Sequence, residues 1–394
     1  MNNACDLIVI GAGPAGLMAG CETVRGNLSV IIIEKDDRIG YPLNCGEAVT
    51  VGSVNGLLTI KPHWIKNRIE RGLLVSPSGH TVELHHPEAG YILDRPVMEQ
   101  DLADEFVAAG GTLMTGCRAV GLGKGTTLFE SITFVDSDER ERQLFAHVFI
   151  AADGVEGTIA RRTGIDNRLN LNKTEAFLQY RLHGVSGEPD LMEIYIGSDV
   201  APRSYAWVFP RGVEEVTVGL GVPTTDGDQL RARELLDRFV VRRFGGGDVV
   251  ATSCGTSPRY QGPDRLALSN LLVVGDAARV LDSVTGAGIA NAILSGKIAG
   301  QAAVAYVRSD TKSLQNMYDI YPRQFTAQQH HILKRYAEIK DVIDRLSDQE
   351  LDEVVLALDD YFGTKTVDSI SPMAIFLGIV KKRPRLLKLA RHLF

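Results

Sequence analysis

The sequence lacks any pattern that would organise its few cysteines. Five cysteines occur in 394 residues, and no two of them form a Cys-x-x-Cys pair. Their scattered spacing argues against a disulfide framework, a zinc site and an iron–sulfur cluster. We therefore expect no metal in this protein.

Long apolar runs and an excess of basic residues are also missing. No run of about 18 apolar residues occurs, so the sequence predicts no membrane-spanning helix. The net charge of −7 argues against nucleic acid as a partner. The first apolar strand pattern begins at Asp6, which leaves little room for a signal peptide. We expect a cytoplasmic protein.

A dinucleotide-binding motif is present close to the start. Residues 6–16 read Asp-Leu-Ile-Val-Ile-Gly-Ala-Gly-Pro-Ala-Gly, an apolar strand followed by a Gly-x-Gly-x-x-Gly turn. Gly11 permits the tight turn, Gly13 allows backbone to approach a pyrophosphate, and Gly16 allows helix and strand to pack closely. The helix N-terminus that follows favours phosphate. Glu34 ends the next apolar run and is placed to bind a ribose.

Two later segments indicate which dinucleotide binds. Residues 271–278, Leu-Leu-Val-Val-Gly-Asp-Ala-Ala, are a buried-strand pattern that ends in Gly-Asp, and residues 285–292 begin a helix rich in small residues. Asp276 can accept a ribityl hydroxyl, and the helix N-terminus can face the anionic side of a reduced flavin. A third apolar strand ends in Asp153-Gly154. The three signals in this order predict FAD.

These signals lie far apart, so the cofactor domain is expected to be built from separate segments. We predict an FAD-binding domain from residues 1–60, 90–165 and 255–305, a substrate domain from 61–89 and 166–254, and a helical region over 306–394. The fold class is α/β with α+β elements: a Rossmann-like domain, an antiparallel-sheet substrate domain and C-terminal helices. Within these parts, residues 97–107 show helical periodicity, 127–150 an antiparallel meander and 172–222 a strand-rich pattern.

The order of these motifs, with Arg95 ahead of a helix, is similar to the flavoprotein hydroxylase superfamily, whose type fold is that of p-hydroxybenzoate hydroxylase. Residues 38–48, Arg-Ile-Gly-Tyr-Pro-Leu-Asn-Cys-Gly-Glu-Ala, resemble the cysteine-containing segment of the geranylgeranyl reductase family. Residues 205–212, Tyr-Ala-Trp-Val-Phe-Pro-Arg-Gly, followed by Val-Gly-Leu-Gly at 218–221, resemble its substrate-domain signature. This family of FAD-dependent oxidoreductases includes the digeranylgeranylglycerophospholipid reductases. The resemblance covers roughly residues 5–310.

The resemblance implies reduction of isoprenoid double bonds by reduced flavin, on archaeal ether lipids, chlorophyll precursors or quinone tails. Matching residue by residue, Ala15 and Glu34 would contact the adenosine half of FAD. Arg95 would reach the pyrophosphate or ribityl region, and Ala119 would meet the adenine through its backbone.

The same matching implies contacts to the other half of FAD. Asp276, Gly288 and Ile289 would hold its ribityl and isoalloxazine portions. In the segment after the second strand, three residues would lie along the cofactor: Cys45, Gly46 and Ala48. Two positions depart from the family pattern: Ala48 stands where glycine is frequent, and Gly157 replaces a serine after Ala-Asp-Gly.

An alkene reductase must hold its substrate near flavin N5, exclude water and supply a proton to the second carbon. Tyr205, Trp207 and Phe209 alternate along one predicted strand, so they share a face and could form the wall of an apolar tunnel. The alternative is that they are ordinary sheet core. Each CH₂ group buried in such a tunnel contributes about 0.8 kcal/mol.

Cys45 is the candidate catalytic side chain, since flanking Pro42, Asn44 and Gly46 indicate a loop in which core packing explains less. Its thiol could donate a proton, gate the tunnel or respond to redox state. Water is an equal candidate for the proton. Glu47 is either an acid or a carboxylate of a surface loop, and we favour the surface loop.

The sequence leaves more than one electron donor and more than one reaction class open. No second Gly-x-Gly-x-x-Gly follows a strand, so a dedicated nicotinamide domain is not expected, and NAD(P)H would bind transiently or a ferredoxin-like carrier would deliver electrons. The same fold also serves aromatic hydroxylases that use a flavin hydroperoxide. A flavin-bearing lipid carrier or redox sensor is the alternative that is not an enzyme.

The end of the chain is basic. Residues 381–394 contain six Lys or Arg residues and no acid, and follow the apolar stretch 373–380. Such a tail could sit on an anionic membrane surface as a peripheral contact. The alternative is a solvated final helix that packs its leucines on the body of the protein, and we favour this second interpretation.

Overall fold

The computed structural model describes residues 4–225, 231–262 and 266–362. Two compact units make up the chain. Unit 1 contains Met1–Leu43, Arg95–Leu169 and Pro258–Lys334, and unit 2 contains Asn44–Asp94, Asn170–Ser257 and Arg335–Phe394. The three-part division into functional domains stays a prediction, because the compactness of a unit does not say which ligand it binds.

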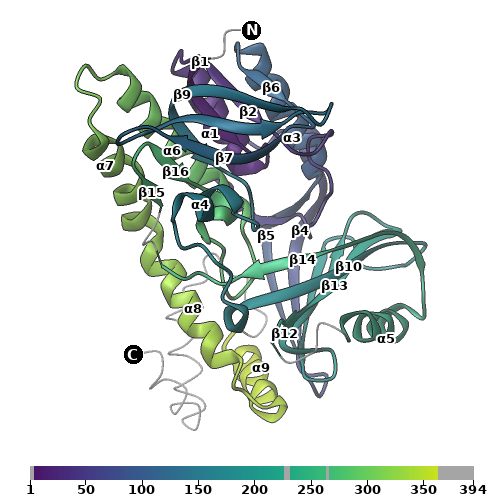
Figure 1. Ribbon diagram of the computed structural model, residues 1–394. Helices are drawn as coiled ribbons and strands as arrows, with labels where there is room; N and C mark the ends of the chain where they lie inside the picture. Colours follow the sequence, from purple (N-terminus) through teal and green to yellow (C-terminus); the bar gives the residue numbers. More distant parts are fainter. Residues whose placement is uncertain (1–3, 226–230, 263–265, 363–394) are drawn as a thin grey trace. The chain divides into compact units, whose positions relative to one another are not determined.

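The central sheet of unit 1 is parallel, with the strand order β15-β16-β9-β1-β2-β6 (Figure 1). Neighbours from β16 to β6 all pair in parallel, and β15 adds an antiparallel edge strand. A meander of β7, β8 and β9 pairs antiparallel, as predicted for residues 127–150. The strands are β1 (Ala4–Ile10), β2 (Val30–Ile33), β6 (Thr112–Met114), β7 (Arg118–Lys124), β8 (Phe129–Val135), β9 (Glu141–Ala151), β15 (Ala267–Leu268) and β16 (Leu271–Val273).

Helices of unit 1 pack closely because small residues line their contacts. Helix α1 packs on both α6 and α3. A Cβ atom placed on Gly296 would lie only 2.1 Å from the carbonyl oxygen of Ala15, so glycine is needed where α6 crosses α1. The bounds are α1 (Pro14–Arg25), α3 (Arg95–Ala108), α4 (Thr158–Thr163), η4 (Gly275–Ala278), α6 (Ile289–Arg308), α7 (Leu314–Phe325) and η5 (Thr326–His330).

Unit 2 is built on a second sheet, of order β14-β10-β13-β12-β11-β4-β5-β3. Its strands are antiparallel neighbours at every pair whose register is described, except β11 and β4, which run parallel. The strands are β3 (Ala48–Thr50), β4 (Ile65–Val75), β5 (Thr81–Leu93), β10 (Thr174–His183), β11 (Leu191–Gly197), β12 (Ala201–Pro210), β13 (Glu215–Pro223) and β14 (Asp248–Pro258).

Short and long helices complete unit 2. The bounds are α2 (Val51–Val54), η1 (Pro62–Trp64), η2 (Leu171–Lys173), α5 (Ala232–Phe244), α8 (His331–Ile343, whose first residues belong to unit 1) and α9 (Asp348–Phe362). Residues 44–60, expected within the FAD-binding domain, belong to compact unit 2. The physical reason is that β3 pairs antiparallel with β5, which ties this segment to the second sheet.

One face of the second sheet is a conventional hydrophobic core. Leu178, Tyr180, Val218 and Leu220 pack there with side chains of α5, which lies beside β10 and β13 in Figure 1. The residues between them in sequence point to the opposite face, because side chains alternate along a strand. Strands β10 and β13 therefore carry two different surfaces.

The basic stretch 381–394, considered above as a membrane contact, lies outside the described residues. Among the residues that the structure does describe, no helix combines the length and apolarity needed to cross a bilayer.

Candidate functional site

The glycine turn of unit 1 has the geometry that its sequence predicts. Gly11 has φ +102°, and a Cβ atom there would lie 2.3 Å from the carbonyl oxygen of Ala152. A Cβ atom on Gly16 would lie 1.9 Å from the carbonyl oxygen of Gly11, so the close packing of helix and strand requires glycine. Glu34 lies at the end of β2, and its Oε2 accepts a 2.6 Å hydrogen bond from the Ala12 N–H.

Two helix N-termini in unit 1 fit the phosphates and ring of a flavin dinucleotide. Helices α1 and α6 begin after Gly13 and Gly288, and neither cap residue makes a side-chain hydrogen bond to the first turn. A Cβ atom on Gly13 would meet nothing within 4 Å, so there is open space over this turn. Free first-turn N–H groups and the positive end of the helix dipole attract anions. These residues therefore fit the diphosphate of FAD.

Asp276 lies beside residues from two other segments of unit 1, the starts of α6 and α3. A Cβ atom on Gly288 would be 3.4 Å from Asp276 Oδ1, and Ile289 is the buried first residue of α6. Burial raises the pKa of the Asp276 carboxyl, while the nearby charges of Arg95 and Arg279 oppose the rise. The structure thus brings Asp276, Gly288 and Ile289 together, and Arg95 is close enough to influence the carboxylate. Their roles toward FAD stay predictions.

Arg95 is also held by a buried carboxylate. Its Nε donates to Glu99 Oε1 at 2.8 Å, and Glu99 is 2% exposed. This i, i+4 pair on the first turns of α3 fixes the guanidinium. Ala119 lies in β7, and the Cys117 N–H two residues before it donates to the Glu34 carbonyl oxygen at 2.8 Å. The segment leading to Ala119 therefore passes the end of β2, where an adenosine is expected.

Three polar residues near Asp276 were not predicted as site residues. Arg279 donates from Nη1 to the Asp276 carbonyl oxygen at 2.7 Å and from Nη2 to the Asn167 carbonyl oxygen at 2.6 Å. Asp153 accepts a 2.8 Å hydrogen bond from the Ile159 N–H through Oδ2. One buried polar atom on each side chain has no partner among the described residues: Arg279 Nε, Asn167 Oδ1 and Asp153 Oδ1. Only the Asp-Gly pair at residue 153 was a visible sequence signal.

The aromatic strand β12 of unit 2 carries its rings on one face, as its alternation predicts. The Trp207 and Phe209 rings stack with centroids 6.0 Å apart, and the Tyr205 and Trp207 centroids are 5.8 Å apart. Trp207 is 7% exposed. Register places Trp207 opposite Gly219, and Gly219 opposite Gln179. A Cβ atom on Gly219 would be 2.4 Å from Trp207 Cζ2, so this glycine makes room for the indole ring.

Cys45, Gly46 and Ala48 lie in unit 2, next to this aromatic face. A Cβ atom on Gly46 would lie 2.7 Å from Phe209 Cε2 and 3.6 Å from Trp207 Nε1. Gln179 Nε2 donates to the Cys45 carbonyl oxygen at 2.9 Å. Ala48 begins β3. The cysteine segment and the aromatic strand, 160 residues apart, are therefore neighbours, although each was predicted separately.

Glu47 is not a surface carboxylate, so that interpretation of the sequence is wrong. The residue is 1% exposed, and its carboxylate forms an ion pair with Arg211, which is 4% exposed. Arg181 Nη2 lies 3.6 Å from Glu47 Oε2, and Arg211 Nε donates to Glu215 Oε1 at 2.9 Å. An ionised carboxylate survives burial only with such partners. No local signal indicated this burial, because the two arginine partners lie 134 and 164 residues further along the chain.

Two buried polar atoms on the aromatic face lack hydrogen-bond partners among the described residues. They are the indole Nε1 of Trp207 and the amide Oε1 of Gln179, whose residue is 5% exposed. One is a donor and the other an acceptor. Unsatisfied buried polar groups are rare in native proteins and are frequent at functional sites. This face is therefore a better candidate for ligand contact than the face covered by α5.

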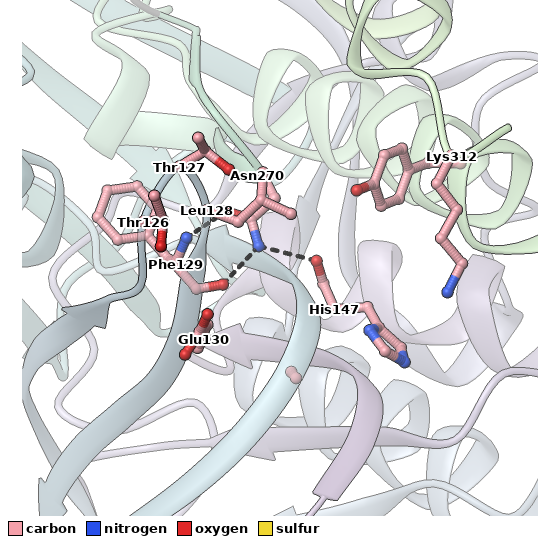
Figure 2. Close-up of a pocket in the computed structure, with 10 residues that line it drawn as sticks. Thr126, Thr127, Leu128, Phe129, Glu130, His147, Asn270 and Lys312 are labelled. Atoms are coloured by element: carbon pink, nitrogen blue, oxygen red, sulfur yellow. Dashed lines mark hydrogen bonds between the residues drawn. The ribbon is translucent and has the colours of Figure 1, made fainter.

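A separate surface pocket of about 300 Å³ lies in unit 1, between the β8 strand and neighbouring segments (Figure 2). Buried Asn270 ties its walls together: Nδ2 donates to the carbonyl oxygens of Phe129 and His147 at 2.7 and 2.8 Å. None of the predicted site residues lines it. The lining residues are Thr126, Thr127, Leu128, Phe129, Glu130, Ala146, His147, Asn270, Tyr306 and Lys312.

Comparisons with known proteins agree with this geometry. Residues 6–57 match the model of an FAD binding domain, and residues 173–256 match the model of the geranylgeranyl reductase catalytic domain. The first match contains the glycine turn, and the second contains the aromatic strand with Gln179 and Gly219. The fold and site define an FAD-dependent oxidoreductase.

Similar curated proteins narrow the class. The chain is 31% identical over 366 residues to the digeranylgeranylglycerophospholipid reductase of Methanosarcina acetivorans, covering 91% of this chain and 90% of that protein. It is 32% identical over 400 residues to the protein of the same name from Methanosphaerula palustris, covering 98% of this chain and 97% of the relative. The chain therefore belongs to the geranylgeranyl reductase family.

Solved structures show the same fold. A geranylgeranyl bacteriochlorophyll reductase-like protein from Thermoplasma acidophilum superposes with a TM-score of 0.91 at 29% identity, covering 99% of both chains. A flavin-dependent brominase superposes with a TM-score of 0.71 at 16% identity, covering 97% of this chain and 100% of the other. The second likeness shows the fold alone. The predicted fold class and the FAD cofactor are confirmed.

Proposed function

We propose that this protein saturates carbon–carbon double bonds in the geranylgeranyl chains of a glycerophospholipid. The observation that carries the proposal is the match of the catalytic-domain model to residues 173–256, within a chain that folds as an FAD-dependent oxidoreductase. The names of the relatives support a prenylated glycerophospholipid as the substrate. Family membership favours the reductase over an aromatic hydroxylase, which shares the fold.

Unit 1 supplies the residues that would hold the cofactor. The first turns of α1 and α6 would bind the diphosphate and the flavin end, with Gly11, Gly13 and Gly16 shaping the approach. The Asp276 carboxylate would accept a hydrogen bond from a ribityl hydroxyl. The Glu34 carboxylate would accept one from a ribose hydroxyl. When bound, reduced FAD supplies a hydride from N5 to one alkene carbon.

Unit 2 supplies the residues that would bind the prenyl chain. Tyr205, Trp207 and Phe209 form a continuous apolar wall on one sheet face. An isoprenoid chain offers no charge, so affinity must come from burial at about 0.8 kcal/mol per CH₂ group. The wall also excludes water, which protects the reacting alkene from competing chemistry.

The second alkene carbon needs a proton, and we propose Cys45 as its donor. The thiol is half-buried and lies in the loop packed against Phe209. Hydride and proton together add one H₂ across the double bond, and the two electrons come from the reductant of the flavin. NAD(P)H or a ferredoxin-like carrier is the proposed reductant, and a panel of both with stopped-flow flavin spectra would identify it.

The proposal is tested anaerobically with the full-length FAD-loaded protein. Its flavin is reduced with dithionite, a digeranylgeranyl glycerophospholipid is added, and flavin reoxidation is followed together with product mass. We expect reoxidation with a gain of two mass units per reduced double bond. A saturated phytanyl lipid is the control and should leave the flavin reduced.

Two other outcomes would contradict the reductase. Rapid reoxidation by oxygen that depends on a phenol, with no reaction of prenyl lipids, would establish a hydroxylase. A flavin that cycles between redox states without changing any prenyl chain would establish a carrier or sensor.

Contact of residues 381–394 with an anionic membrane surface stays the less favoured of the two interpretations of this basic tail. Co-sedimentation with phosphatidylglycerol vesicles tests this against a chain that ends at residue 380. Equal binding by both chains would rule out this contact.

A further inference from the structure

The sulfur of Cys45 is engaged by the backbone of its own loop. The Glu47 N–H donates to Cys45 Sγ at 3.2 Å. Glu47 adopts the left-handed conformation, with φ +64°, which a residue with a side chain adopts only at a cost in free energy. The loop is strained at the point where it contacts the thiol.

The Glu47 side chain is anchored where it cannot move freely. Its carboxylate pairs with Arg211, and Arg211 in turn donates from Nε to Glu215 Oε1 at 2.9 Å. The Leu93 N–H donates to the Glu47 carbonyl oxygen at 2.9 Å. Arg211 is 4% exposed, so its guanidinium bridges two carboxylates inside unit 2.

The opposite side of the loop is held as well. Gln179 Nε2 donates both to the Cys45 carbonyl oxygen, at 2.9 Å, and to Ser253 Oγ, at 2.8 Å. The Cys45–Glu47 segment is therefore fixed by Gln179 at one end and by Arg211 at the other.

We propose that Arg211 is a positioning residue for Cys45. By holding the Glu47 carboxylate, Arg211 anchors Glu47 in place and so keeps its N–H on the Cys45 sulfur. The role of Cys45 in proton donation rests on the proposed function, but the positioning of its sulfur does not. The hydrogen-bond partners of Arg211 are Glu47 and Glu215, so its action on the sulfur runs through Glu47.

A simpler role would be charge compensation alone. A buried ion pair is weak as a source of stability, because desolvation offsets much of its attraction, whereas removing one partner is strongly destabilising. Charge compensation would therefore account for Arg211 without any effect on Cys45. The two roles differ in what happens when both charges are removed together.

The test measures the alkylation rate of Cys45 by iodoacetamide in the FAD-loaded protein, with site-resolved mass spectrometry. In Arg211→Met we expect the rate to change by at least about fivefold, the factor equivalent to a typical net hydrogen bond. The control is Arg243→Met, because Arg243 of α5 pairs at 2.6 Å with the buried carboxylate of Glu193, on the opposite face of the same sheet. That variant should keep the Cys45 rate within about twofold.

The double variant Glu47→Gln/Arg211→Met separates the two roles. We expect its melting temperature to recover toward that of the wild type while the Cys45 alkylation rate stays altered. Recovery of both quantities would overturn the proposal in favour of charge compensation. A wild-type rate in Arg211→Met would overturn it directly.

Arg211→Lys covers the case in which Arg211→Met does not fold. Lysine keeps the charge but cannot bond Glu47 and Glu215 through one planar fork, so the alkylation rate should move in the same direction by a smaller factor. An unchanged rate would again overturn the proposal. Alkylation needs no turnover, so a failed reductase assay and a failed positioning test remain distinguishable. If Cys45 donates the proton, Arg211→Lys should lower kcat and leave KM near its wild-type value.

Discussion

The two faces of the β10–β13–β12 sheet in unit 2 are made from alternate residues of the same strands. On one face, Leu220 and Val218 are fully buried against α5. On the other, Gly219 lies between Trp207 and Gln179, and both of those side chains carry a buried polar atom with no partner among the described residues. The first face is closed by apolar packing. Within the described part of the chain, the second face has an unpaired donor on Trp207, an unpaired acceptor on Gln179 and a glycine between these two side chains.

This difference shows how one element serves stability and chemistry together. The α5 face supplies burial that holds the strands rigid, at about 25 cal/mol per Å² of apolar area. The rigid strands then hold the aromatic face and the cysteine loop in fixed positions, which is the condition that a reacting site needs.

Truncating Phe239, on the α5 face, should lower the stability of the fold most. Phe239→Ala removes a ring from α5 that is 2% exposed and packs edge-on against Tyr195 with centroids 4.9 Å apart. We expect a loss of about 4 kcal/mol in the free energy of unfolding. Urea unfolding followed by circular dichroism measures it, with Val241→Ala on the exposed side of the same helix as the control. A loss below about 1 kcal/mol would show that this face is not the core.

Glycine substitution should identify the crowded face. Gly219→Ala places a methyl group 2.4 Å from Trp207 Cζ2 and 2.6 Å from Gln179 Cβ. We expect a loss of about 2 kcal/mol from overpacking. The reductase turnover should fall as well, since Trp207 must shift. Gly72→Ala in β4 of the same sheet is the matched control, because a Cβ atom there meets nothing within 4 Å. Equal effects of the two substitutions would contradict the comparison.

Phe209→Ala should affect substrate more than stability. The Phe209 ring is half-buried and stacks on Trp207, so its loss should cost only about 1 kcal/mol of unfolding free energy. We expect KM for a prenyl lipid to rise by about fivefold or more, through lost apolar contact. Steady-state kinetics beside thermal unfolding gives both numbers. A stability loss as large as that of Phe239→Ala, with KM unchanged, would make the aromatic strand ordinary core.

Tyr195 at the edge of the α5 face gives the smallest effect. Burial, with the hydrogen bond to Glu193, raises the pKa of the Tyr195 hydroxyl. The folded protein therefore holds this proton more tightly than the unfolded chain, in which the tyrosine pKa is about 10. The stabilisation is present below that pH and is lost as the pH rises above it.

Tyr195→Phe keeps the ring and removes this titration. We expect the free energy of unfolding to fall by less than about 1 kcal/mol at neutral pH. At alkaline pH it should decline less steeply than that of the wild type. Urea unfolding from pH 7 to 11 tests both. An alkaline decline as steep as that of the wild type would assign the pH dependence to other groups.

The sequence predicted the elements around the cofactor well because their signals are local. Gly11 and Gly16 sit at fixed spacing within one turn, and Asp276 follows a buried strand directly, so each could be recognised from its neighbours. The shared face of Tyr205, Trp207 and Phe209 followed from strand alternation and is confirmed. Strand pairing was not local. The placement of residues 44–60 in unit 2 depends on β3 pairing with β5, about 40 residues away.

What the sequence alone determined is therefore the class of protein: a glycine turn, two strand-end aspartates and an aromatic signature define the family through short-range spacing. Tertiary structure alone decided the state of Glu47. A glutamate between two small residues in a loop has the composition of a surface position, and nothing within ten residues indicates a cationic partner in the core. Its burial beside Arg211 exists only because the loop and the end of β12 meet in the fold, since long-range electrostatic partners are chosen by topology and not by sequence distance.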